Sequence, residues 1–193
     1  VVGNDKTLNH VVNVVAGHNV TLGFIPIGNE NNKVAASLGI GQGVAACDIL
    51  SARLVLNLDL GVINDIFFLS HLNLEAGPAE LDCDGSYQIK LGKGSRVVIT
   101  NIRPTDLNAE GLEKYAFSPR DGRIEVVVEP SQGWTKAFKK SERPSVFSIK
   151  RLNLTSRKPT PILTDGGQLL KTPAEVHVKP KALKLIVGKN RKF

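Results

Sequence analysis

Several common features are missing from this chain of 193 residues. It has no methionine, even at its first position, and it opens on Val1-Val2, which is typical of the end of a buried strand, so we expect a fragment or a processed chain. Its two cysteines are too few for a disulfide framework and form no Cys-x-x-Cys pair, so they predict no disulfide partner and a reducing, cytoplasmic setting. Aromatic residues make up only 5%, which argues against the stacking platforms of a single-strand nucleic-acid binder.

The signatures of three other classes of protein are absent as well. Residues 8–29 contain no Asp, Glu, Lys or Arg, but they include Asn9, His10, Asn13 and Pro26, so they do not predict a transmembrane helix. The four histidines show no ligand spacing with each other or with the cysteines, so no zinc site is indicated. No Gly-x-Ser-x-Gly segment supports a serine hydrolase.

The formal net charge of +7 is divided unevenly along the chain. Residues 1–135 carry a net charge of −5, whereas residues 136–193 carry +12. A basic segment of this kind suits anionic lipid headgroups, phosphate groups or nucleic acid, but it is at least as consistent with a solvated surface that keeps the protein soluble. Charge alone leaves these alternatives open.

The first fifty residues have the pattern of an α/β unit. After a predicted turn at 3–6, apolar side chains recur at helical spacing at Leu8, Val11, Val12 and Val15. Residues 21–25 predict a short buried strand, and helices are expected over 31–38 and 44–52. The glycine-rich residues 39–43 follow a helix instead of a strand, so we interpret them as a helix–helix connection. This alternation predicts parallel strands.

Over residues 53–182 the hydrophobic period changes to two, which predicts an antiparallel sandwich or barrel. Half-buried strands are expected at 54–58, 66–74, 87–91, 97–100, 123–129, 146–154 and 176–178. The pair at 87–91 and 97–100 should form a hairpin across 92–94. The strand at 146–154 changes phase, which predicts a β-bulge. Trp134, Ala137 and Phe138 have the spacing of a helix within this part.

The first residues that carry chemistry lie between the opening strand and the first helix. Gly3, Asp5 and Thr7 form a Gly-x-Asp-x-Thr segment, where backbone N–H groups and the positive end of a helix dipole suit a phosphate group. Asp5 suits a magnesium ion or a ribose hydroxyl. The simpler interpretation is a turn in which Asp5 or Thr7 caps the helix.

A second segment of the same kind follows one α/β unit later. The first reads Val1-Val2-Gly3-Asn4-Asp5-Lys6-Thr7-Leu8-Asn9, and the second Pro26-Ile27-Gly28-Asn29-Glu30-Asn31-Asn32-Lys33-Val34-Ala35. In order and spacing the two segments resemble the catalytic domain of the diacylglycerol kinase, sphingosine kinase and bacterial lipid kinase family, which has Gly-Gly-Asp-Gly-Thr and then Pro-Leu-Gly-Thr-x-Asn-Asp-Phe-Ala. Further similar segments cover almost the whole chain, at 58–61, 67–68, 97–101, 118–124, 164–167 and 178–185.

The resemblance implies an α/β plus all-β fold in two lobes. A partial doubly wound nucleotide-binding lobe is expected at residues 1–52, without the family's early strands and phosphate loop. An antiparallel β-sandwich, the lipid-binding lobe, is expected at 53–193, with its last strands returning toward the first lobe. The implied activity is a lipid kinase that uses ATP and Mg²⁺ to phosphorylate a diacylglycerol-like lipid at a membrane surface. The expected setting is the cytoplasm and the membrane periphery, and nucleic acid is not the expected partner.

The resemblance also implies roles for individual residues. Asp165 is the implied general base, which takes the proton from the lipid hydroxyl. Asp121 is the candidate metal ligand, and both Asp59 and Asp121 could support the metal or the packing of the lobes. For these two, an ordinary strand-end or turn carboxylate is the simpler interpretation. The implied nucleotide-binding residues are Gly3, Asn4, Asp5, Lys6, Thr7, Gly28, Asn29 and Asn31.

Several residues depart from the family motifs. Asn4 and Lys6 replace two glycines, which removes the close backbone approach that glycine permits, although Lys6 could itself supply a charge for phosphate. Gly167 stands where the family has a glutamate next to its base, and Asn29, Glu30 and Asn32 also differ from the family. These departures favour an alternative function, a catalytically weakened relative that binds nucleotide or lipid without turnover. A third alternative is a basic nucleic-acid or membrane-surface binder.

Overall fold

The computed structural model describes residues 1–28, 32–75, 79–92, 94–103, 112–129 and 143–193. The helix expected around Trp134 lies outside these ranges. No helix within them is long and apolar enough to span a membrane. The elements are β1 (Val2–Gly3), α1 (Asp5–Val15), β2 (Thr21–Leu22), β3 (Ile25–Pro26), α2 (Lys33–Ser37), α3 (Ala45–Ala52), β4 (Val55–Ile63), β5 (Ile66–Phe68), β6 (His71–Glu75), β7 (Ala79–Cys83), β8 (Tyr87–Leu91), β9 (Arg96–Thr100), β10 (Ile124–Glu129), β11 (Ser145–Ile149), β12 (Arg151–Ser156), β13 (Pro161–Thr164), β14 (Leu169–Lys171) and β15 (Ala174–Ile186).

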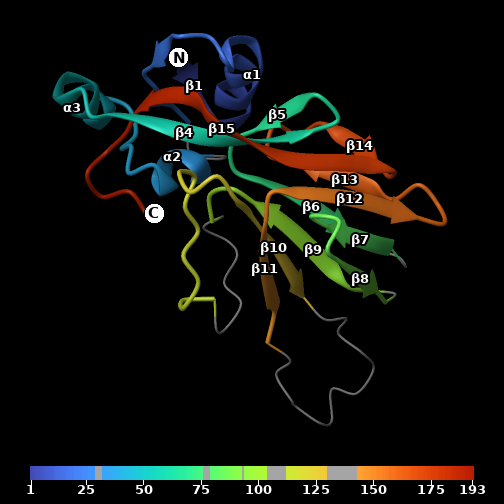
Figure 1. Cartoon of the computed structure of the whole chain (residues 1–193). Coiled ribbons are helices and arrows are strands. Elements are labelled where there is room, and N and C mark those ends of the chain that lie inside the picture. Colours follow the sequence, from blue (N-terminus) through green and yellow to red (C-terminus); the bar gives the residue numbers. More distant parts are fainter. Residues whose placement is uncertain (29–31, 76–78, 93, 104–111, 130–142) are drawn as a thin grey trace.

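Helix α1 begins inside the predicted turn. Asn4 is its N-cap, and the side-chain oxygen of Asn4 accepts a hydrogen bond from the backbone N–H of Thr7 at 3.2 Å. The prediction that Asp5 or Thr7 caps the helix is therefore wrong. The apolar stripe is confirmed, because Leu8 is 1% and Val12 0% exposed, and the stripe holds α1 against the strands below it in Figure 1.

The parallel pairing expected of an α/β unit is present, but the strand predicted at 21–25 is two strands. β3 pairs in parallel with β1, with Val2 opposite Ile25. β2 instead pairs in parallel with β15, with Lys184 opposite Thr21. The two halves of the predicted strand thus have different partners, at opposite ends of the sequence. Val2 is 59% exposed, so the opening residues are not the end of a buried strand.

Two antiparallel sheets make up the rest of the chain (Figure 1). One has the order β11-β10-β9-β6-β13-β14, and the other β5-β4-β15-β12-β7-β8, with β2 also beside β15. Buried side chains from both sheets form one core cluster, among them Leu72, Ile99, Leu152 and Val176. These sheets confirm the α/β plus all-β fold class and the sandwich. The division of the chain into lobes at residue 53 stays a prediction.

Three predictions about strands are wrong because the chain crosses from one sheet to the other. The strand at 66–74 is two strands, since β5 pairs with β4 whereas β6 pairs with β9 and β13. The phase change at 146–154 is such a crossing and not a bulge, because β11 pairs with β10 and β12 with β7 and β15. The hairpin across 92–94 is wrong, because β8 pairs with β7 and β9 pairs with β6 and β10.

Two of the strands expected to be half-buried are covered on both faces. Residues 58–63 of β4 and 124–127 of β10 are buried throughout. A second core cluster explains the first case, since Leu58 and Leu60 pack with Leu8 and Phe24 of the α/β segment. In the second case, Leu112 and Phe117 belong to a small cluster that covers Val127.

The carboxylate of Asp59 joins three separate segments at the border of these clusters. Its Oδ2 accepts a hydrogen bond from the N–H of Gly122 at 2.7 Å, and its Oδ1 accepts one from the N–H of Lys181 at 2.8 Å. The N–H of Asp59 donates to the carbonyl oxygen of Pro119 at 2.7 Å. Asp59 is 1% exposed, and these are the contacts of a packing carboxylate.

Candidate active site

The turn between β13 and β14 carries a carboxyl group with a strongly raised pKa. Asn9 Nδ2 on α1 donates to Oδ1 of Asp165 at 2.6 Å, and the N–H of Ser70 donates to Oδ2 at 2.6 Å. Burial raises the pKa of Asp165 to about 7, against the lowering effect of its backbone hydrogen bonds. The nearby charge of Asp5 raises this pKa further. A carboxyl group with a pKa near neutrality can accept a proton at physiological pH.

Two asparagines of α1 hold Asp165 in this position. Asn13 Nδ2 donates to the carbonyl oxygen of Phe67 at 2.8 Å and to Asn9 Oδ1 at 3.1 Å, and the N–H of Phe67 donates to Asn13 Oδ1 at 2.8 Å. Because Asn9 Oδ1 accepts from Asn13, its Nδ2 is turned toward Asp165. Neither asparagine was among the predicted site residues. Asp5, Asn9 and Asn13 follow one another at intervals of four residues, which places three polar side chains on one face of the helix. This spacing is a signal that could have found the two asparagines.

Asp5 is turned toward α2. Its Oδ2 accepts a hydrogen bond from the N–H of Val34 at 2.9 Å, and its Oδ1 accepts one from the N–H of Ala35 at 3.3 Å. Burial is the largest effect on the pKa of Asp5 and raises it, while these N–H groups lower it. Both oxygens are thus engaged within the protein, and Asp5 connects the first turns of α1 and α2.

The side-chain oxygen of Asn4 accepts hydrogen bonds from Thr7 that a glycine at position 4 could not accept. Besides the N–H of Thr7, the Oγ1 of Thr7 lies within hydrogen-bond distance of Asn4 Oδ1, at 3.3 Å. Both groups belong to the predicted phosphate site at the N-terminal end of α1. The departure from the family motif at position 4 therefore has a direct consequence, because a protein oxygen lies where a phosphate oxygen was expected.

Lys6 and Gly167, two departures from the family motifs, are neighbours in the fold. A Cβ atom added to Gly167 would lie 3.3 Å from Cε and 3.5 Å from Nζ of Lys6. Gly167 also has a φ of +79°, which favours glycine. The Lys6 side chain thus lies against the turn that carries Asp165, on the side where a residue at 167 would project. The long side chain of Lys6 fits here because Gly167 has no side chain.

The remaining predicted nucleotide residues lie close to this end of α1 where the structure describes them. Gly3 is in contact with Thr7, since an added Cβ would lie 2.6 Å from Thr7 Oγ1. Gly28 follows β3, and the N–H of Ile27 donates to the carbonyl oxygen of Gly3 at 2.9 Å. Asn32 Nδ2 donates to the carbonyl oxygen of Gly28 at 2.9 Å. Asn29 and Asn31 lie outside the described residues.

The candidate metal ligand Asp121 has other neighbours. Its Oδ1 accepts a hydrogen bond from the N–H of Arg123 at 3.0 Å, and its charge acts on Glu125. It lines a cavity of about 380 Å³ together with Gly122, Lys150, Arg151, His177, Val178 and Pro180. In the ranges that the structure describes, no group of three His, Cys, Asp or Glu could hold a metal ion. The role of Asp121 as a metal ligand therefore stays a prediction.

Comparison with solved structures identifies the fold. A diacylglycerol kinase from Bacillus anthracis superimposes with a TM-score of 0.78 and 20% identity over 98% of this chain and 76% of that one. A putative diacylglycerol kinase from the same organism has the same TM-score at 17% identity, with the same coverage. The chain has the diacylglycerol kinase fold. Yeast NADH kinase, with a TM-score of 0.59 and 15% identity over all of this chain and 62% of that one, shares the fold more distantly.

Sequence comparison adds one curated relative. An uncharacterized protein of Synechocystis is 24% identical over 233 aligned residues, which include 95% of this chain. The chain spans 53%, about half, of the length of that protein. No family model matches the chain. The diacylglycerol kinase fold is thus found by structure, at sequence identities of 17–20%.

Proposed function

We propose that this chain is a phosphotransferase that moves the γ-phosphate of ATP to a hydroxyl group of a diacylglycerol-like lipid. The observation that carries the proposal is the carboxyl group of Asp165, with a pKa of about 7, held by Asn9 and Ser70 beside the first turns of α1. The diacylglycerol kinase fold supports the choice of reaction. Phosphoryl transfer requires mainly positioning and charge stabilisation, and Asp165 in these contacts is a positioned base.

The proposed roles follow from the contacts. Asp165 accepts the proton of the lipid hydroxyl while the hydroxyl oxygen bonds to the γ-phosphorus, and the bond from this phosphorus to the oxygen that bridges it to ADP breaks. Gly3, Thr7 and Gly28 form the wall on which the phosphates lie, and Lys6 supplies a positive charge next to Asp165. Asp5 keeps the two segments of this wall together through Val34 and Ala35. Mg²⁺ is proposed only as the companion ion of ATP.

A second candidate function is binding of nucleotide or lipid without turnover. The contact between Lys6 and Gly167 favours it, because the space beside the candidate base holds a lysine chain. Asn4 favours this second function too, because its side chain accepts hydrogen bonds from Thr7 at the N-terminal end of α1, where a phosphate group was predicted to bind. In this alternative the fold retains a binding site, but the charge stabilisation of the transition state is lost.

One assay separates the two candidates. The chain is incubated with labelled ATP, Mg²⁺ and a short-chain diacylglycerol that dissolves in water, and labelled lipid is extracted and counted. Formation of phosphorylated lipid supports the kinase. Calorimetric binding of ATP without product would support the second candidate and contradict the first. Absence of both ATP binding and product would contradict the kinase and the nucleotide-binding form of the second candidate.

The variant Asn4→Gly is expected to bind ATP more tightly, by about fivefold to tenfold, because the N–H and hydroxyl of Thr7 become available to phosphate oxygens. Loss of the N-cap should cost only a few tenths of a kcal/mol of stability, since glycine is itself an accepted N-cap residue. Calorimetric titration of ATP into both proteins measures the change. The variant Asn19→Gly, in the exposed turn after α1, is the control. Equal affinities of wild type and Asn4→Gly would contradict the prediction.

A further inference from the structure

The hairpin that carries Asp165 exposes a pair of leucines. Leu163 on β13 and Leu169 on β14 are directly opposite each other in the ladder, and they are 46% and 63% exposed. The adjacent pair in the ladder, Ile162 and Leu170, points to the other face and packs into the core of the sandwich. Neighbouring side chains of a strand point to opposite faces, so Leu163 and Leu169 lie together on the outer face of the hairpin.

Among the described residues, this outer face is open at the β14 end of the six-stranded sheet. Near β9 and β10 the same face is covered, because Leu112 and Phe117 pack on Val98 and Val127. No described segment covers Leu163 and Leu169 in the same way, as their exposure shows. β14 is also the last strand in the order of its sheet. The leucine pair is therefore an apolar surface at a sheet edge.

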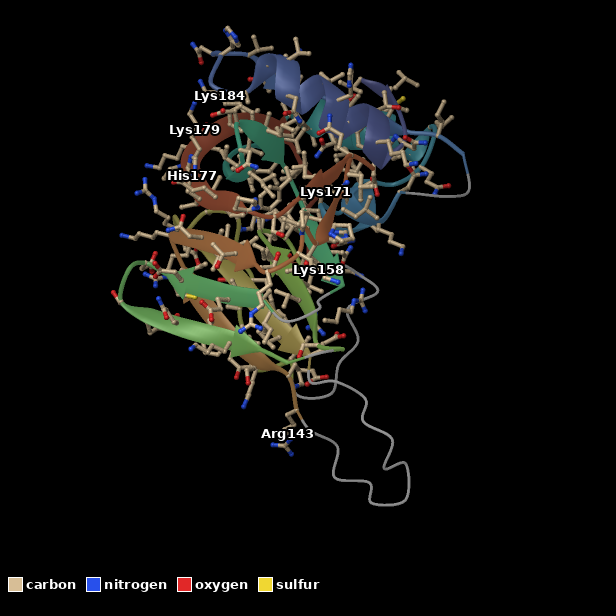
Figure 2. All side chains as sticks on the ribbon, turned by 90° about the vertical axis from the view of Figure 1, so that its right-hand side faces the viewer. Arg143, Lys158, Lys171, His177, Lys179 and Lys184 are labelled. Atoms are coloured by element: carbon tan, nitrogen blue, oxygen red, sulfur yellow. The ribbon has the colours of Figure 1, made fainter. Side chains whose placement is uncertain are left out.

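One lysine shares the face of the leucine pair, and a second lies in the turn that precedes β13. Lys171 is opposite Pro161, two residues along from the leucines, so it lies on the same outer face. Lys158 belongs to the turn between β12 and β13, which is joined to Thr172 through the N–H of Thr160 at 2.9 Å. Figure 2 shows Lys158 and Lys171 on the same side of the molecule. Among the described residues neither lysine takes part in an ion pair.

The turn that carries the candidate base adjoins this surface in the chain. Asp165 follows Leu163 by two residues, and the Lys6 side chain reaches the same turn at Gly167. The oxygens of Asp165 are turned inward, toward Asn9 and Ser70, so the carboxylate does not present its charge to the outer face. A ligand on the leucine pair would therefore meet apolar side chains, with lysines around them.

We propose that the outer face of the β13–β14 hairpin binds the surface of an anionic lipid bilayer. Leu163 and Leu169 would enter the boundary between headgroups and acyl chains, and Lys158 and Lys171 would pair with anionic headgroups. The apolar pair suits the acyl-chain boundary, and the two lysines, which form no ion pair within the described ranges, suit the anionic headgroups. The inference rests on the proposed function, because the hairpin that would lie on the bilayer also carries the candidate base.

Co-sedimentation with vesicles tests the proposal. The wild type is expected to bind vesicles of phosphatidylcholine with phosphatidylglycerol, and to bind phosphatidylcholine alone much more weakly. The double variant Leu163→Thr with Leu169→Thr should lose about tenfold in vesicle affinity. Lys158→Gln and Lys171→Gln should each bind the anionic vesicles about fivefold more weakly than the wild type. This difference in affinity should be smaller at high salt. The controls are Val55→Thr, an exposed strand residue of β4, and Lys90→Gln on β8, which should bind as the wild type.

Three results would overturn the inference: no binding of anionic vesicles by the wild type, equal loss in variants and controls, or binding of RNA that depends on the lysines while vesicle binding does not. Failure of the proposed function is distinguishable. If vesicles bind through this face but no phosphorylated lipid forms, the inference stands and the proposed function fails. If the water-soluble diacylglycerol is phosphorylated while vesicle binding is indifferent to the four substitutions, only the inference fails.

Discussion

Replacement of Asp165 by Asn is expected to slow phosphate transfer about 10²-fold to 10⁴-fold, because an amide cannot accept the proton of the lipid hydroxyl. The amide has nearly the shape of the carboxyl group, and its oxygen can still accept a hydrogen bond from Asn9 or Ser70. The affinity for ATP should therefore change little. Initial rates with the short-chain diacylglycerol and calorimetric titration of ATP measure the two quantities separately.

The pH dependence of the wild-type rate gives a second readout. Burial raises the pKa of Asp165 to about 7, so the deprotonated form that acts as a base becomes abundant only as the pH rises through this value. The rate should be about half of its maximum near pH 7 and level off at higher pH. Asp48→Asn, which makes the same substitution at an exposed position of α3, should leave both the rate and the pH profile unchanged. A nearly wild-type rate in Asp165→Asn would show that another group accepts the proton.

Replacement of Glu125 by Gln is expected to stabilise the fold above pH 7, by up to about 3 kcal/mol. Glu125 on β10 is 3% exposed, and its Oε2 has no partner among the described residues. Burial, and then the charge of Asp121, raise the pKa of Glu125 to about 7. The glutamine side chain removes the buried charge and can still accept the hydrogen bond that Ser148 donates to Oε1.

The direction of the pH effect follows from the two pKa values. The native protein holds the proton of Glu125 more tightly than the unfolded chain, whose pKa is about 4.5. The stability that this proton contributes is fully present below pH 4.5, the pKa in the unfolded chain, and is lost as the pH rises through about 7, the pKa in the folded protein. The advantage of Glu125→Gln over wild type should therefore appear only across this range and above it.

Urea unfolding of wild type and Glu125→Gln at about pH 4, 6 and 8 measures this advantage as a difference in the free energy of unfolding. The comparison isolates Glu125, because Asp165 is present in both proteins. Glu129→Gln on the same strand is the control, since Glu129 pairs with Arg96 at the surface at 3.6 Å and should change stability by at most about 1 kcal/mol. A constant difference at all three pH values would contradict the assigned titration.

Local patterns were sufficient for the elements whose neighbours in space are also near in sequence. The apolar stripe at Leu8 and Val12 predicted the buried face of α1, and residues 39–43 do connect α2 and α3. Such elements depend on helical spacing and on turn residues, both of which are visible within a window of a few residues. The extended segments were recognisable as strands for the same reason.

Pairing between strands was not predictable in this way. The continuous strand predicted at 66–74 is divided between two sheets, and the residues at 92–94, predicted as a hairpin turn, join strands that do not pair with each other. Each sheet has a core face and an outer face, so a crossing changes which residues face inward without any change in composition. Partners such as β2 and β15, at opposite ends of the chain, are chosen by the packing of the whole core.

The sequence by itself determined the fold class and, through the resemblance, the two residues on which the proposed chemistry depends, Asp5 and Asp165. Only the tertiary structure decided what these residues touch. It turned Asp5 toward α2, placed Asn9 against Asp165, and brought Lys6 to Gly167 from 161 positions away in the chain. Motifs record residue types and spacing, whereas hydrogen bonds and burial depend on which distant segments meet. Reactivity depends on those contacts, because they set pKa values and occupy donors.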